Sequence, residues 1–207
     1  MKNFSRRIVD GQKIFGERCF KLALTLFALD NVAQAYTTVQ LCDRNVETVI
    51  SDLSKTVKNF GVTLWGKEYY TYKGERRCQL HFGNSKTNVV RFRINNDNSV
   101  VWAFVSATLQ YSQSDEEKDY IIAQTVMTAL QLTDCIGLSE SDSDALSDKL
   151  QELATKWRAA LKNDPSNTHG QAWLWCPSVQ RYVLLDIEIR DLSDDTASMD
   201  FTFSAYK

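Results

Sequence analysis

The sequence predicts an α+β domain in which an antiparallel sheet of hairpins packs on about three helices. Three stretches carry apolar residues at helical spacing, and strand-like stretches lie between and after them. Two-residue turns join several of the strand-like stretches, and only antiparallel neighbours can be joined so briefly. We therefore expect the helices to cover one face of the sheet.

The first helix is expected over 46–60, where apolar residues keep helical spacing up to Gly61, with Asp43 or Asn45 as its N-cap. Four strand-like segments follow, at 62–65, 68–72, 76–82 and 88–94. The next segment, 99–111, is apolar on both faces at its centre. Such a strand is typical of the middle of a sheet that helices cover.

Ser114 and Glu117 form a capping-box pattern that opens a second helix ending near Gly137. The acidic, serine-rich stretch 139–148 lacks the ligand order of a calcium loop, so we interpret it as the capped, solvated start of a third helix, which runs to Leu161. Three strand-like segments complete the chain, at 172–176, 182–190 and 199–206. Each half thus runs from a helix into hairpins, which favours two similar helix-plus-hairpin halves.

The first 35 residues have the three parts of a secretory signal. Basic residues dominate the leading segment, an apolar run spans 22–29, and Ala33-Gln34-Ala35 supplies a small-x-small cleavage pattern. The run is too short to cross a bilayer as a helix. We predict that residues 1–35 are a signal peptide, that 36–207 form a single α+β domain without a membrane span, and that the protein is periplasmic or secreted. A retained N-terminal helix from Ile14 to Ala35 is the alternative.

Charge excludes one class of partner. The chain carries 24 basic and 26 acidic residues, a formal net charge of −2, and removing the six basic and three acidic residues of the first 35 leaves −5. An acidic domain with no basic block has no electrostatic footprint for nucleic acid. Its length fits one domain of ordinary size.

The cysteine count supports export. Of five cysteines, Cys19 lies in the predicted signal, which leaves Cys42, Cys78, Cys135 and Cys176. An even number of dispersed cysteines in an exported domain predicts two disulfides. Each helix and the strand that returns beside it cover similar lengths, which favours the bonds Cys42 to Cys78 and Cys135 to Cys176. Four buried free thiols are the alternative.

No motif in the sequence predicts catalysis, a metal site or a cofactor. A nucleophilic cysteine needs a histidine base, and His81 and His169 are the only histidines. A loop can bring His169 to Cys176, so a cysteine hydrolase stays open as an alternative. We expect a protein that is not an enzyme and that binds neither a metal nor a cofactor.

Aromatic and basic side chains supply the candidate binding residues. Tyr70 and Tyr72 share one strand face, as do Trp173 and Trp175, and each pair can line a groove for a ligand or a partner protein. Four basic residues are expected to form a strip on the open face of the sheet: Arg77, His81, Arg91 and Arg93. Core filling by the aromatic rings and a merely solvated basic strip are the alternative interpretations.

These observations favour a non-enzymatic exported protein that binds another protein, as an inhibitor, an immunity protein or a secretion-accessory protein does. A carrier of a small ligand, with a pocket between sheet and helices, is the second hypothesis. The order helix, three strands, helix is also similar to that of type III secretion chaperones, small acidic proteins that bind unfolded effector segments. That resemblance implies a cytosolic, chaperone-like protein if residues 1–35 are retained, and it assigns no residue.

Overall fold

The computed structural model describes residues 37–163, 168–193 and 195–207, and the side chains of these except 156–163, 168 and 193. The predicted signal peptide lies outside these ranges, so export stays a prediction. The chain divides into two units, of which the second, Thr38–Lys207, contains every helix and strand described below.

Within the described ranges the chain forms nine strands and three helices. They are β1 (Thr38–Val39), β2 (Cys42–Asn45), α2 (Val46–Lys58), β3 (Leu64–Tyr72), β4 (Glu75–Phe82), β5 (Val89–Ile94), β6 (Ser99–Gln110), α3 (Asp115–Cys135), α4 (Glu140–Asn163), β7 (Thr168–Cys176), β8 (Arg181–Ser193) and β9 (Thr196–Tyr206). All strand pairs are antiparallel, so the predicted α+β fold of hairpins on about three helices is confirmed.

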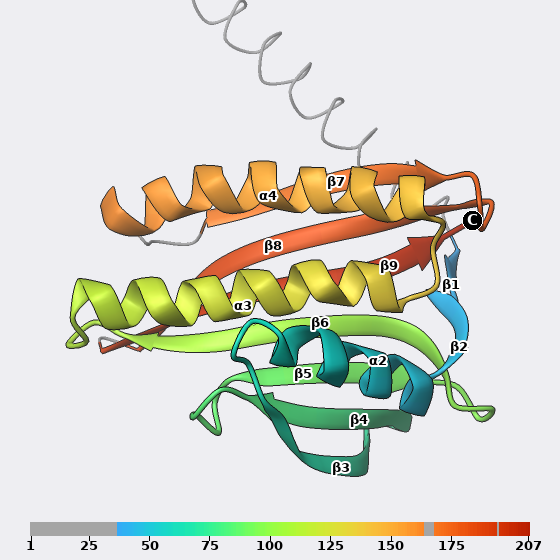
Figure 1. The fold of residues 1–207 in the computed structure, drawn as a ribbon, viewed down its shortest axis with the longest axis horizontal. Coiled ribbons are helices and arrows are strands. Elements are labelled where there is room, and N and C mark those ends of the chain that lie inside the picture. Colours follow the sequence, from blue (N-terminus) through green and yellow to red (C-terminus); the bar gives the residue numbers. More distant parts are fainter. Residues whose placement is uncertain (1–36, 164–167, 194) are drawn as a thin grey trace, which may run out of the picture. The chain divides into compact units, whose positions relative to one another are not determined.

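The strands follow the order β3-β4-β5-β6-β9-β8-β7, with β2 beside β6 and β1 beside β9. Each consecutive group of strands, β3 to β6 and β7 to β9, forms hairpins, and the two groups meet through their last strands (Figure 1). This arrangement agrees with the predicted pair of helix-plus-hairpin halves, because α2 precedes the first group and α3 and α4 precede the second.

The three helices lie side by side over one face of the sheet (Figure 1). Helix α3 contacts β6 and β9, α4 contacts β7 and β8, and α2 contacts α3 and β2. Every second side chain of the strands joins them in the core; the largest fully buried strand side chains are Phe82, Phe92, Phe201, Phe203, Leu185 and Ile187. The alternate side chains form the opposite face, which no helix of the described ranges covers, and we call it the open sheet face.

Side-chain caps set the helix ends where the sequence predicts them. The Asn45 side chain accepts a hydrogen bond from the Glu47 amide at the start of α2. Ser114 and Glu117 form both bonds of the capping box, and α3 ends with Ile136 at its C-cap, before Gly137 at φ 81°. The Ser139 hydroxyl accepts from the Asp142 amide, so the serine-rich stretch does cap α4.

Two strand predictions need correction. Segments 62–65 and 68–72 form one strand, β3, because the register shifts between Trp65 and Glu68 as at a β-bulge. Gly66 lies there at φ 65°, and a Cβ on it would meet His81 Cδ2 at 2.9 Å, so the bulge requires glycine. Strand β6 is central as predicted, but Trp102 and Phe104 lie half-buried on the open sheet face instead of under helices.

The predicted disulfides are absent, since Cys42, Cys78, Cys135 and Cys176 are buried free thiols. Strand β2 and strand β4 lie three strand spacings apart, about 14 Å, which exceeds the reach of a disulfide between Cys42 and Cys78. The Cys135 sulfur faces α2, 3.9 Å from Thr56 Oγ1, whereas Cys176 ends β7 near the start of α4. The cysteines therefore act as small apolar side chains in the core.

Truncating a central core side chain should destabilise the domain far more than truncating an exposed one of the same type. Phe203 on β9 is fully buried, so we expect Phe203→Ala to lower the free energy of unfolding by about 3–5 kcal/mol in urea titrations. Phe60→Ala is the control, since that ring is 53% exposed, and should cost less than about 0.5 kcal/mol. Equal losses for the two variants would contradict the described core.

The four thiols should be protected in the native protein and free after unfolding. Burial raises the pKa of Cys78, Cys135 and Cys176 to about 11, so their reactive thiolates are scarce at neutral pH. We expect iodoacetamide to leave all four unmodified in native protein and to alkylate all four after denaturation without reductant, as read by peptide mass mapping. A cysteine that reacts only after reduction would show that disulfides form after all.

Candidate protein-binding face

All eight binding residues predicted from the sequence lie on the open sheet face. They are Tyr70 and Tyr72 on β3, Arg77 and His81 on β4, Arg91 and Arg93 on β5, and Trp173 and Trp175 on β7. Tyr69, which directly precedes Tyr70, points to the other side, where its hydroxyl donates to Glu47 of α2. The structure thus places the predicted basic strip and both predicted aromatic pairs on one surface, which the sequence did not predict.

Cross-strand pairing aligns these residues in rows. One row crosses seven strands through Tyr70, Arg77, Arg93, Trp102, Ser204, Leu184 and Trp173. The neighbouring row runs through Glu68, Gln79, Arg91, Phe104, Thr202, Asp186 and Gln171. Trp102 and Phe104 form the aromatic centre, with ring centroids 6.0 Å apart. Sequence reasoning missed this centre, because apolar residues on both faces predicted a strand buried on both sides.

The basic half of the face consists of the open-face side chains of β3 to β5. Glu75 joins two of its arginines, with Oε2 accepting from Arg77 at 2.7 Å and Oε1 accepting from Arg93 at 2.8 Å. These two guanidinium groups hold the pKa of the Glu75 carboxyl below its usual value. The Arg77 guanidinium also lies over the rings of Tyr72 and Trp102, at 4.7 and 5.6 Å from their centroids.

Arg91 is positioned without being neutralised. Its Nε and Nη2 both donate to Gln79 Oε1, at 3.0 and 2.7 Å, and its guanidinium lies 5.5 Å from the Phe104 centroid. In the part of the chain that the structure describes, it forms no ion pair with a carboxylate. A shallow depression of about 440 Å³ opens beside it, and the residues that line it are Glu68, Tyr70, Tyr72, Arg77, Gln79 and Arg91. The charged groups of this depression are thus two guanidinium groups and the Glu68 carboxylate, beside two tyrosine rings.

His81 contributes less to the basic strip than the sequence predicts. Its ring lies against Trp65, with centroids 4.7 Å apart, and its buried Nδ1 has no hydrogen-bond partner among the residues that the structure describes. The positive charge of this half therefore comes from its three arginines, which outnumber the open-face carboxylates of Glu68 and Glu75 by one.

The acidic half consists of the open-face side chains of β7 to β9. Asp200 is buried and accepts from Ser106 Oγ at 2.6 Å and from Arg190. Asp186 and Glu188 lie on the neighbouring strand, and Arg190 is the only arginine or lysine among the described open-face side chains of these strands. Three carboxylates against one arginine make this half negative.

Two tryptophans form the rim of the acidic half. Trp173 packs against Tyr206 and Trp175 against Tyr182, with ring centroids 5.1 and 5.0 Å apart. Although both are packed, 42% of Trp173 and 46% of Trp175 remain exposed. Rings that are held in place and still half-exposed are well suited to contact a partner.

The structure keeps apart the two residues of the alternative cysteine hydrolase. His169 lies on the open sheet face, where Nε2 is 2.7 Å from Asp186 Oδ1 without the alignment of a hydrogen bond. Cys176 lies seven residues further along β7, on the helix-covered face, about 23 Å away along the strand. Burial and the nearby Asp142 carboxylate raise the pKa of the Cys176 thiol to about 11, opposite to the activation that a nucleophile needs.

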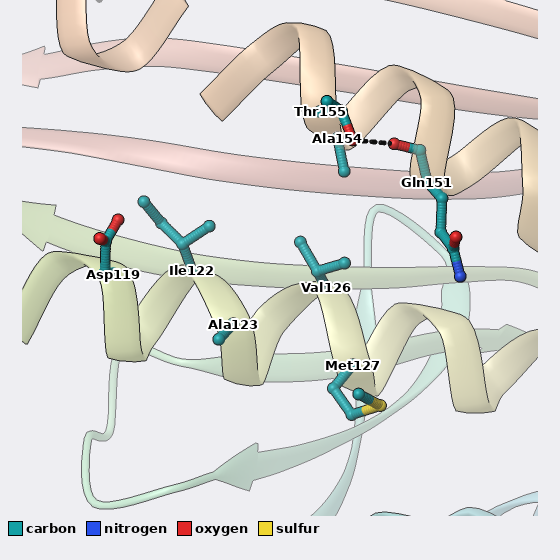
Figure 2. A pocket seen from close by; sticks show the side chains of 8 residues that line it. All are labelled: Asp119, Ile122, Ala123, Val126, Met127, Gln151, Ala154 and Thr155. Atoms are coloured by element: carbon teal, nitrogen blue, oxygen red, sulfur yellow. Dashed lines mark hydrogen bonds between the residues drawn. The ribbon is translucent and has the colours of Figure 1, made fainter. Parts of the chain in front are cut away.

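A groove on the helical side bears on the small-ligand hypothesis. It holds about 330 Å³ between α3 and α4, and Figure 2 shows the residues that line it: Asp119, Ile122, Ala123, Val126, Met127, Gln151, Ala154 and Thr155. All eight belong to the two helices, so this groove is not the predicted pocket between sheet and helices.

Three further findings concern metal binding, membrane-spanning helices and similarity to known proteins. The described residues contain no group of three or more His, Cys, Asp or Glu side chains that could hold a metal ion. None of the helices in the described ranges combines the length and the apolar character needed to cross a membrane. Comparisons with protein families, with curated proteins and with solved structures find no match. The candidate site therefore depends on the geometry of the open sheet face alone.

The Glu75 ion pairs should make a small, pH-dependent contribution to stability. Because the folded pKa of Glu75 is lowered, this contribution is present above the unfolded pKa near 4.5 and is lost as the pH falls through the folded value. We expect Glu75→Gln to lower the free energy of unfolding by up to about 1 kcal/mol at pH 7 and by less at pH 3, as measured in urea. Asp148→Asn, an exposed change on α4, is the control, and a loss for Glu75→Gln that grows on acidification would contradict the assignment.

Proposed function

We propose that this protein is not an enzyme and acts by binding another protein through its open sheet face, after export as its N-terminal sequence predicts. One observation carries the proposal: the eight candidate residues and the aromatic centre share a face that no helix of the described ranges covers. Inhibitors, immunity proteins and secretion-accessory proteins all work by such contacts.

The residue types on the face support protein binding. Tyrosine, tryptophan and arginine contribute a large share of the binding energy in protein interfaces. Here they stand on strands of one sheet instead of on loops, and stacking and hydrogen bonds already hold Arg77 and Arg91 in place. Little side-chain freedom is then lost when a partner binds, which favours affinity.

Charge defines the kind of partner. The guanidinium of Arg91 suits a carboxylate of the partner, and the carboxylates of Asp186 and Glu188 suit its lysine or arginine side chains. Between the two halves the aromatic centre requires apolar contact. The proposed partner thus presents an apolar patch with a negative side and a positive side.

The cytosolic, chaperone-like alternative uses the same face and differs in compartment. If residues 1–35 are retained, the same aromatic and charged side chains would meet an unfolded segment in the cytosol. The intact mass of the protein isolated from its own host separates the two, since cleavage after Ala35 supports export and a full-length chain supports the alternative.

A photo-crosslinker should capture a protein from the open sheet face and not from the helical side. We expect p-benzoylphenylalanine at Trp175 to give an adduct of defined mass in host cells, because this ring stands half-exposed on the face. The matched control replaces Tyr120, which is 58% exposed on α3, and should give none. Adducts from Tyr120 alone, or none from Trp175, would contradict the proposed function.

A further inference from the structure

We propose that the open sheet face is covered by a second copy of this chain, in a twofold dimer whose axis runs along β6. The inference rests on the proposed function, because it names a partner for the same face.

Strand β6 is the middle of the seven strands that form the continuous order β3-β4-β5-β6-β9-β8-β7. A half-turn about an axis in the interface, parallel to β6, places β6 on β6 of the other copy. The same operation places β3 on β7, β4 on β8 and β5 on β9 of the other copy. The strands of the two sheets then run in nearly the same direction, as in aligned sheet packing.

The aromatic residues at the two rims match under this operation. Tyr70 and Trp173 lie in the row of Trp102, each three strands from β6. Tyr72 and Trp175 lie two residues further along, both towards the Val100 end of β6. Each tyrosine therefore faces a tryptophan of the other copy. This contact covers tryptophan rings that are otherwise 42% and 46% exposed.

Charge selects this axis over the one perpendicular to it. In the dimer the basic half of each copy, with three arginines against Glu68 and Glu75, lies on the acidic half of the other, with three carboxylates against Arg190. Asp186 lies opposite Gln79, between Arg91 and Glu68, so it is the net charges of the two halves that attract. The contact occurs twice, so the attraction is doubled. An axis across the strands would place the basic half on the basic half, and like charges facing each other disfavour that arrangement.

The area suits a reversible dimer. Six strand spacings of about 4.8 Å and three row spacings of about 6.7 Å give a face of about 29 by 20 Å. Such a face buries about 600 Å² on each copy, or about 1,200 Å² in total, which is the lower limit for specific interfaces. A dimer of this size exchanges, so another protein with the same chemistry can displace the second copy.

A charge-exchange experiment tests the dimer. Arg91→Glu alone replaces the guanidinium beside Asp186 of the other copy by a second carboxylate at both contacts, and Asp186→Arg alone brings two guanidinium groups together there. We expect the full-length wild-type chain to sediment as a dimer at about 100 µM and each variant to shift at least tenfold towards monomer. An equimolar mixture should recover the dimer, because both contacts then join opposite charges.

The control is Asp148→Arg on α4, which should leave the dimer unchanged, and circular dichroism checks the fold of each variant. A wild-type monomer at about 100 µM, or a mixture that stays monomeric, overturns the inference. Crosslinks from Trp175 to a different protein would then still support the proposed function. If a charge variant does not fold, the Trp175 crosslink in the purified protein decides: a dimer adduct mapping to the Tyr72 peptide supports the inference, and the absence of that adduct overturns it.

Discussion

The pairing of β6 with β9 is the contact on which the rest of the structure depends. It joins two groups of hairpins, from Trp102 opposite Ser204 to Gln110 opposite Thr196, and it turns two small sheets into one. Helix α3 lies over this junction, where Phe201 and Phe203 are fully buried. Each group alone would leave a long apolar strand at its edge, and such edges tend to pair with other chains.

The same junction places the functional residues. Because β6 is central, its Trp102 and Phe104 lie between a half rich in arginine and a half rich in carboxylates. Helices cover the other side of the sheet, so these polar and aromatic side chains meet no helix in the described ranges. A sheet is a rigid support, and stacking of Arg77 on Tyr72 and Trp102 orders the surface further.

Because the four cysteines are free thiols, the cysteine count no longer supports export. An even cysteine count favours disulfides in an exported chain, but Cys42 and Cys78 lie on strands that the sheet holds too far apart. The core of this domain is large enough to be stable by apolar burial. Export therefore depends on the pattern of the first 35 residues alone.

The sequence by itself determined the local elements and the side of each strand that a residue occupies. Apolar periodicity placed the helices, Ser114 and Glu117 placed a cap, and alternation placed Tyr70 with Tyr72 and Trp173 with Trp175 on shared faces. Only the tertiary structure decided which strands are neighbours, which rows align, and that the faces carrying those residues are the same face. The physical reason is that side-chain alternation is local, whereas strand order and register come from contacts between distant segments.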